Sequence, residues 1–160
     1  MRPMLRPLFS VISLILLPAR VGLADVASQP LPAIKSGSST LVVSVQGLQT
    51  QCGTVVALLF PSEQGFPAKE AKAIQRQAVK TGETTAELRF PNLASGTYAV
   101  TVYHDINDNG KLDTNWVGIP KEPVGVSNNP KPRMGPPRFQ DASFHLSESE
   151  QKVAVNLVKP

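Results

Sequence analysis

Short runs in which apolar and polar residues alternate recur along this chain, and no other feature constrains its fold as strongly. A period of two places successive side chains on opposite faces of a β-strand. In the clearest run, Gly96–His104, the even-numbered residues from Tyr98 share one face and the odd-numbered residues from Ala99 share the other. Further strands are predicted at residues 41–46, 55–60, 74–80, 85–90, 142–146 and 152–158. About seven short strands with turns between them predict an all-β fold, an antiparallel β-sandwich.

Three other segments carry signals of their own. Helix-forming residues occur in Ser62–Ala73, where we expect one or two turns of helix. Tyr98 follows the turn residue Gly96 by two positions, which is typical of a tyrosine corner, where the hydroxyl bonds to the backbone at the edge of a sandwich. Thr114–Arg138 contains six prolines and no strand pattern, so we predict one long Pro-rich loop there.

The N-terminus has the features of a secretory signal peptide. Arg2 and Arg6 precede an apolar run of about ten residues, and Gly22-Leu23-Ala24 is a cleavage site of the small-x-small type. Residues 1–24 are therefore predicted to be removed on export to the periplasm or the medium. The apolar run is about half as long as a membrane span requires, so we expect no span after cleavage.

Cleavage of the signal peptide would leave a mature chain that starts at residue 25 and has a different net charge. Residues 25–39, rich in Ser, Pro and Gly, predict a flexible leader, and residues 40–160 predict one β-sandwich domain. Three arginines leave with the signal, so the mature chain has 13 basic and 12 acidic residues. Such a balance lacks the basic surface that nucleic-acid binding needs, and no nucleic-acid partner is expected. Cys52, the only cysteine, cannot form an intramolecular disulfide and is predicted to be a small buried hydrophobe at the start of a strand.

The residues that follow the clearest strand have the spacing of a calcium loop. Ca²⁺ prefers oxygen ligands at positions 1, 3, 5 and 9 of a tight turn, with glycine at position 6 and a backbone carbonyl at position 7. These positions are occupied by Asp105, Asn107, Asn109, Gly110, Lys111 and Asp113. Trp116 stands at position 12, where an EF-hand has a bidentate Glu. We therefore expect a weak site, with a Kd of roughly 0.1 to 1 mM, unless Asp108 or Glu122 contributes.

The same residues also suit a polar turn that binds no metal, because Asp and Asn side chains bond to nearby backbone NH groups. The adjoining Pro-rich loop adds an aromatic ring and two amides, and Trp116, Asn128 and Asn129 form a candidate ligand patch. The alternative for Trp116 is that it folds back with Ile119 and covers the open end of the sandwich.

Two pieces of the sequence, taken together, resemble a known family. The segment GTYAVTVYHDINDNGKLDTNWVGIPKEPVGVSNN, with FPNL before it, is similar to the hallmark region of bacterial exported proteins of domain of unknown function family 2141. The likeness runs from about Leu41 to the C-terminus, and it implies an immunoglobulin-like or prealbumin-like sandwich with no assigned activity. The D-x-N-x-N-G-x-x-D piece also resembles the calcium-stabilised B repeats of bacterial surface adhesins, which carry an acidic residue where this chain has Trp116.

Three functions are compatible with these observations. The first is a non-catalytic exported β-sandwich with a weak calcium loop and a surface for an unknown protein or envelope ligand. The second is a small exported hydrolase that uses His104 and Asp105, although two histidines and one cysteine offer few catalytic groups. The third is a purely structural accessory domain.

Overall fold

The computed structural model describes residues 39–131, 133 and 135–159. The predicted signal peptide, residues 1–24, lies outside the described residues, and so does the predicted leader except for Ser39. Ser39 is buried and belongs to a strand, so the last residue of the predicted leader is part of the first described strand. No helix among the described residues is long and apolar enough to cross a membrane.

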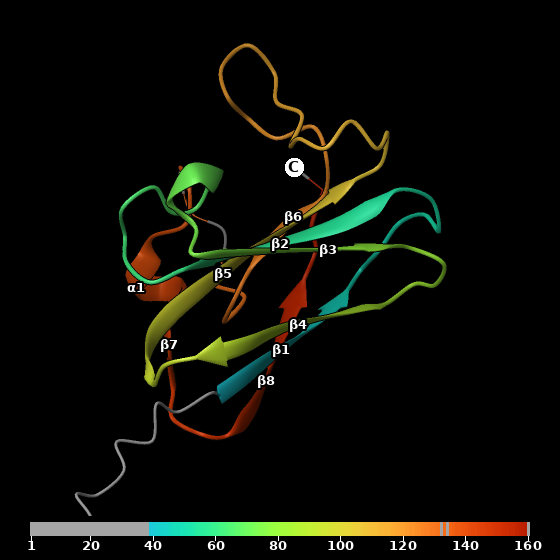
Figure 1. The fold of residues 1–160 in the computed structure, drawn as a ribbon. Coiled ribbons are helices and arrows are strands. Elements are labelled where there is room, and N and C mark those ends of the chain that lie inside the picture. The colour runs from blue at the N-terminus through green and yellow to red at the C-terminus, as the bar shows by residue number, and fades with distance from the viewer. Residues whose placement is uncertain (1–38, 132, 134, 160) are drawn as a thin grey trace, which may run out of the picture. The chain divides into compact units, whose positions relative to one another are not determined.

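Eight strands form two sheets in the described part of the chain (Figure 1). The strands are β1 (Ser39–Gln46), β2 (Thr54–Phe60), β3 (Gln75–Lys80), β4 (Ala86–Leu93), β5 (Gly96–Asp105), β6 (Val124–Val126), β7 (Phe144–Leu146) and β8 (Glu150–Asn156). One sheet has the order β4-β1-β8, and the other has the order β3-β2-β5-β6, with β7 also paired to β5. Every pair is antiparallel except β1 with β8. The prediction of an all-β sandwich is confirmed.

The main core lies between the two sheets, and one face of each long strand supplies it. On β5 this is the predicted face that begins with Tyr98, and Val100 and Val102 are fully buried on it. The other strands contribute Leu41, Val43, Val45, Val55, Ala57, Leu59, Leu88, Phe90 and Val155 to the same core. Each large aliphatic side chain buried in this way stabilises the fold by about 1.5–3 kcal/mol. The hydroxyl of Tyr98 donates a hydrogen bond of 2.9 Å to the carbonyl of Ala94, so the predicted tyrosine corner is confirmed.

The outer face of the five-stranded sheet is also covered, which explains why β2 is apolar without alternation. Its side chains Val56, Leu58, Phe60 and Tyr103 form a second apolar cluster. Segments outside the sheet cover this cluster with Phe66, Ala73, Leu112 and Phe139, and Val124 of β6 packs beside them. The ring of Phe66 lies edge-on between those of Phe60 and Phe139, with centroid distances of 5.5 and 5.7 Å.

The expected one or two turns of helix in Ser62–Ala73 are present as one 3₁₀ turn, η1 (Glu70–Lys72). Two other element predictions need correction. The Pro-rich loop contains strand β6, because the backbone beyond Pro123 completes the hydrogen bonds of the β5 edge. The strand predicted from residue 142 begins two residues later, since the short helix α1 (Phe139–Ala142) precedes it.

Candidate calcium loop and its surroundings

The candidate site is the loop from Asp105 to Asp113, which begins where β5 ends. Asp105 is the last residue of the strand and is almost completely buried. Its two carboxylate oxygens accept hydrogen bonds from the backbone NH groups of Asn109 and Gly110, at 3.1 and 2.7 Å. Gly110 has a φ of +79°, a conformation that glycine adopts without strain. The loop is therefore wound around the carboxylate at its first position.

The side chains at the third, fifth and ninth positions meet one another. The amide nitrogens of Asn107 and Asn109 donate to the two carboxylate oxygens of Asp113, at 2.9 and 3.0 Å. The amide oxygen of Asn107 accepts from the NH of Asn109, and that of Asn109 accepts from the NH of Lys111. The carbonyl oxygen of Lys111 accepts no hydrogen bond from the described residues. The structure thus brings three of the predicted side chains, those of Asn107, Asn109 and Asp113, into contact.

Glu122 braces this loop from outside the nonapeptide. Its carboxylate is buried and accepts from the NH groups of Ile106 and Asp113, at 2.9 and 3.0 Å. The sequence identified Glu122 only as a conditional contributor, because nine residues separate it from Asp113. The bridge between Thr114 and Pro120 shortens that separation in space.

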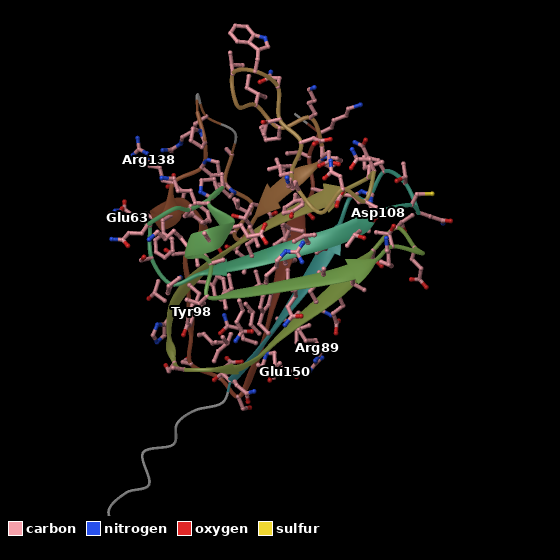
Figure 2. All side chains as sticks on the ribbon, turned by 45° about the horizontal axis from the view of Figure 1, so that its top comes forward. Glu63, Arg89, Tyr98, Asp108, Arg138 and Glu150 are labelled. Carbon is pink, nitrogen blue, oxygen red and sulfur yellow. The ribbon has the colours of Figure 1, made fainter. Side chains whose placement is uncertain are left out.

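Asp108 faces away from the loop interior. Its carboxylate pairs with Lys80 at 2.7 Å and accepts from the hydroxyl of Thr54 at 2.6 Å. The hydrogen bond from Lys80, followed by that from Thr54, holds the pKa of Asp108 below its usual range. Asp108, labelled in Figure 2, therefore attaches the loop to the neighbouring sheet edge. It is not directed at the other candidate ligands.

The donor set fits a hard cation. It consists of the carboxylates of Asp105 and Asp113, the amide oxygens of Asn107 and Asn109, and the carbonyl of Lys111, and it contains no nitrogen or sulfur ligand. Among the described residues, none of the ion pairs involves Asp105, Asp113 or Glu122. No group of three or more His, Cys, Asp or Glu side chains in the described chain is arranged to hold a metal ion. The donor types are therefore those of a hard cation and not of a transition metal. In the structure the amide nitrogens of Asn107 and Asn109, and not their oxygens, are directed at Asp113.

Directly after Asp113 the chain forms a turn that we name the Trp116 hairpin, residues 113–121. It is closed by backbone hydrogen bonds from Lys121 to Asp113 and from Asn115 to Ile119, both of 2.8 Å. The side-chain oxygen of Asn115 also accepts from the NH groups of Val117 and Ile119. In Figure 1 the chain between β5 and β6 projects beyond the ends of the strands.

Trp116 is 95% exposed, and Val117 and Ile119 are about half exposed. The interpretation that Trp116 and Ile119 cover the end of the sandwich is therefore wrong. The physical reason is local, because the bonds to Asn115 hold the hairpin in a conformation that keeps these side chains in solvent.

Among the described residues, no hydrogen bond joins Trp116 to Asn128 or Asn129, the three members of the candidate ligand patch. Asn128 donates its amide to the carbonyl of Ser143 at 2.7 Å. Asn129 donates to the carbonyl of Ala154 at 3.0 Å and accepts from the NH of Asn156 at 2.7 Å. Both asparagines have positive φ angles and attach their turn to the C-terminal strands, whereas Trp116 extends into solvent.

His104, Ser127 and Cys52 are polar groups that a hydrolase could use, and the structure places each of them. His104 is completely buried, and its Nε2 lies 2.8 Å from the carbonyl oxygen of Cys52. Ser127 is completely buried and donates to the carbonyl of Ala142 at 2.6 Å. Cys52 itself is exposed, so the prediction that it is buried is wrong. It lies in the β1–β2 turn before β2 begins, and its backbone, not its thiol, makes the contact with the core histidine.

Comparison with known proteins identifies one family. The sequence model described as uncharacterized protein conserved in bacteria (DUF2141) matches residues 43–154, which is more than half of the 160-residue chain. The matched range includes both the calcium-type loop and the Trp116 hairpin. No curated protein and no solved structure matches the chain.

Proposed function

Since the chain belongs to the family of uncharacterized proteins conserved in bacteria, DUF2141, we propose its function from the geometry of the loop. The protein is an exported, non-catalytic β-sandwich module. Its Asp105–Asp113 loop binds calcium weakly, and the Trp116 hairpin next to it is the surface that meets a protein or envelope ligand.

The observation that carries the proposal is that the loop closes around two carboxylates. The side-chain amides of Asn107 and Asn109 both donate to Asp113, and the backbone NH groups of Asn109 and Gly110 donate to Asp105. Without a cation, the amide NH₂ groups are the neighbours that offset the charge of Asp113. A calcium ion would replace them with a full positive charge and would take the amide oxygens as ligands.

Calcium would also act on the hairpin. The carbonyl of Asp113 accepts from the NH of Lys121, and its NH donates to Glu122, so the last ligand is also the base of the hairpin. A cation that restrains Asp113 therefore restrains the segment that presents Trp116. An exposed tryptophan on an ordered turn is unusual for a surface without a partner, because aromatic residues are enriched where proteins make contacts.

The hydrolase alternative requires His104 to reach a substrate. Its imidazole is completely buried and one nitrogen is engaged by a backbone carbonyl, so a solvent-borne substrate has no access to it in this conformation. A purely structural accessory domain remains the second candidate, and the hydrogen bonds that fill the loop without metal favour it.

The test is thermal unfolding of the mature domain in chelator and in calcium. For a Kd of roughly 0.3 mM, 3 mM calcium adds about 1.4 kcal/mol to the free energy of unfolding. The midpoint should rise by several degrees in a domain of this size. The fluorescence of Trp116, the only tryptophan, reports the same titration three residues from Asp113.

Two matched variants make the test specific. Asp113→Asn removes the charge and keeps one acceptor oxygen, so one of the two bonds from Asn107 and Asn109 is lost with it, and it should abolish most of the calcium-dependent rise. Asp108→Asn removes a charge from the same loop but from a residue directed at Lys80, so the rise should remain. If the wild-type protein melts at the same temperature with and without calcium, the loop is a metal-free turn and the accessory-domain candidate replaces this proposal.

A further inference from the structure

The Trp116 hairpin ends in an uninterrupted apolar tip, the residues WVGIP at positions 116–120. Trp116 is 95% exposed, Val117 53% and Ile119 52%, so three of the six large hydrophobic side chains that are exposed in the described chain lie within this tip. The chain between β5 and β6 projects beyond the ends of the strands (Figure 1). A projecting tip of this kind cannot enclose a small ligand, so its partner is a larger surface.

The backbone NH groups of the tip are already paired inside the hairpin. Those of Val117 and Ile119 donate to the side-chain oxygen of Asn115, at 3.1 and 2.9 Å, and that of Gly118 donates to the carbonyl of Asn115 at 3.0 Å. Of the tip's NH groups, only that of Trp116 forms no hydrogen bond among the described residues, since the fifth tip residue is a proline. A segment that leaves water for lipid must satisfy its donors internally, because lipid offers no replacement for water. The hairpin nearly meets this requirement.

A cation stands beside the tip. Lys121 forms the base of the hairpin, where its NH donates to the carbonyl of Asp113 at 2.8 Å, and its side chain is exposed. None of the ion pairs among the described residues includes Lys121. Tryptophan at the level of the lipid headgroups, with a basic side chain near the phosphates, is typical of protein segments that lie at a bilayer surface. An apolar groove in a protein would receive the tip equally well, but it gives the lysine no role.

The charge next to the hairpin depends on calcium. Residues 105–122 contain four acidic and two basic side chains, and one of the acids, Asp108, is paired with Lys80 outside this range. The remaining three acids and two lysines carry one net negative charge, which an anionic surface repels. One bound Ca²⁺ changes this to one net positive charge, which an anionic surface attracts.

We propose that the Trp116 hairpin docks the protein on an anionic phospholipid bilayer, with the apolar tip at the level of the headgroups and Lys121 at the phosphates, and that calcium in the adjoining loop strengthens this docking. The docking is peripheral, because a tip of five residues reaches the interface and does not cross the bilayer. The effect of calcium rests on the function proposed for the loop, whereas the tip and its lysine do not.

The experiment is co-sedimentation of the mature protein, residues 25–160, with vesicles of equimolar phosphatidylglycerol and phosphatidylcholine and with vesicles of phosphatidylcholine alone. In calcium the protein should bind the anionic vesicles, and the fluorescence of Trp116 should shift to the blue as the indole leaves water. Binding should be about tenfold weaker or less in chelator, and likewise on phosphatidylcholine alone, because both changes remove electrostatic attraction.

Two isoleucine variants form a matched pair. Ile119 and Ile74 are 52% and 49% exposed, and only Ile119 belongs to the hairpin. Ile119→Ser should weaken binding to the anionic vesicles about fivefold or more, whereas Ile74→Ser should bind as the wild type does. A calcium bridge between surface carboxylates and phosphatidylglycerol would act equally on both variants. Lys121→Gln should weaken binding to the anionic vesicles and leave the weaker binding to phosphatidylcholine unchanged.

Thermal unfolding in calcium, measured on the same protein, separates failure of the docking from failure of the calcium loop. If calcium raises the melting temperature but the protein binds neither kind of vesicle, lipid docking is overturned, the calcium loop stands, and a protein is the remaining partner for the hairpin. If calcium leaves the melting temperature unchanged, the calcium loop fails, and equal vesicle binding in calcium and in chelator then overturns the effect of calcium on docking. Equal binding of Ile119→Ser and Ile74→Ser overturns the role of the tip.

Discussion

At the scale of single residues, His104 joins two parts of the chain that are far apart in sequence. Its Nε2 lies 2.8 Å from the carbonyl oxygen of Cys52, and since a carbonyl only accepts, Nε2 carries the proton. Nδ1 is buried without a partner in the described residues. Gly53 allows this contact, because a Cβ there would clash with the backbone oxygen of Asp105. The β1–β2 turn thus rests directly on the start of the calcium-type loop.

Substitutions of His104 should separate its structural role from a catalytic one. His104→Ala should lower the free energy of unfolding by about 3 kcal/mol, because it leaves a cavity and an unpaired carbonyl. His104→Gln can keep the bond to Cys52 through its own amide nitrogen, so about half of that loss is expected. Urea unfolding measures the free energy of unfolding of both variants, provided that their m-values equal that of the wild type.

A hydrolase assay on the folded His104→Gln protein completes the comparison. A histidine-dependent hydrolase would lose its activity in this variant although the fold persists. Equal destabilisation by Ala and Gln would show that the contact with Cys52 does not hold the imidazole in place.

At the scale of elements, the three-stranded sheet has a row of charges that joins its two edge strands. Glu87 and Arg89 lie on β4, and Glu150 and Lys152 lie on β8, with β1 between them. Lys152 pairs with Glu87 at 3.1 Å, and Arg89 pairs with Glu150, whose side chains lie close together in Figure 2. Such exposed pairs contribute little to stability one by one, but here they occur on strands that do not bond to each other directly.

The effect of pH on this row has a definite sign. The hydrogen bond from Lys152, above all, lowers the pKa of Glu87 below its ordinary value of 4.5. A depressed pKa means that the contribution to stability is present above 4.5 and is lost as the pH falls through the folded-state pKa. Lys152→Met should therefore raise the pKa of Glu87 in an NMR titration.

The stability gap between wild type and Lys152→Met should be largest at neutral pH and low salt, and it should close in acid or at high salt. Lys72→Met removes an exposed lysine that forms no ion pair among the described residues, and it should leave the Glu87 titration unchanged. If the difference in stability between wild type and Lys152→Met does not depend on pH, its cause is the packing of the lysine side-chain carbons and not the ion pair.

At the scale of the whole molecule, the C-terminal segment connects the two sheets. Strand β8 runs parallel to β1 in the three-stranded sheet. Two residues further on, Val158 exchanges two backbone hydrogen bonds with Val124 of β6, at 2.9 and 3.0 Å, in the other sheet. The side chain of Asn129 adds two bonds to the same segment, at Ala154 and Asn156.

Removal of this segment should prevent folding. A chain that ends at Ser149 loses β8 and with it the buried side chains of Val155 and Leu157, and it exposes one edge of β1. Circular dichroism and amide exchange should report an unfolded or aggregated protein. A chain that ends at Val158 keeps every one of these contacts and should melt within a few degrees of the full-length protein. A folded monomer that ends at Ser149 would contradict this role for β8.

The sequence by itself determined the features that depend on neighbouring residues. Alternation of side chains defined the main strands, the spacing from Gly96 placed the hydroxyl of Tyr98 at a sheet corner, and Asx and glycine chemistry predicted the turn after Asp105. Each of these depends on backbone geometry within a few residues, so it can be read without knowledge of the fold.

Only the tertiary structure decided the features that depend on distant contacts. The exposure of Cys52, the second covered face of the larger sheet and the inward position of Glu122 all result from pairing between segments far apart in the chain. Strand β6 is the clearest case, because three residues between prolines become a strand only when the edge of β5 offers them hydrogen bonds.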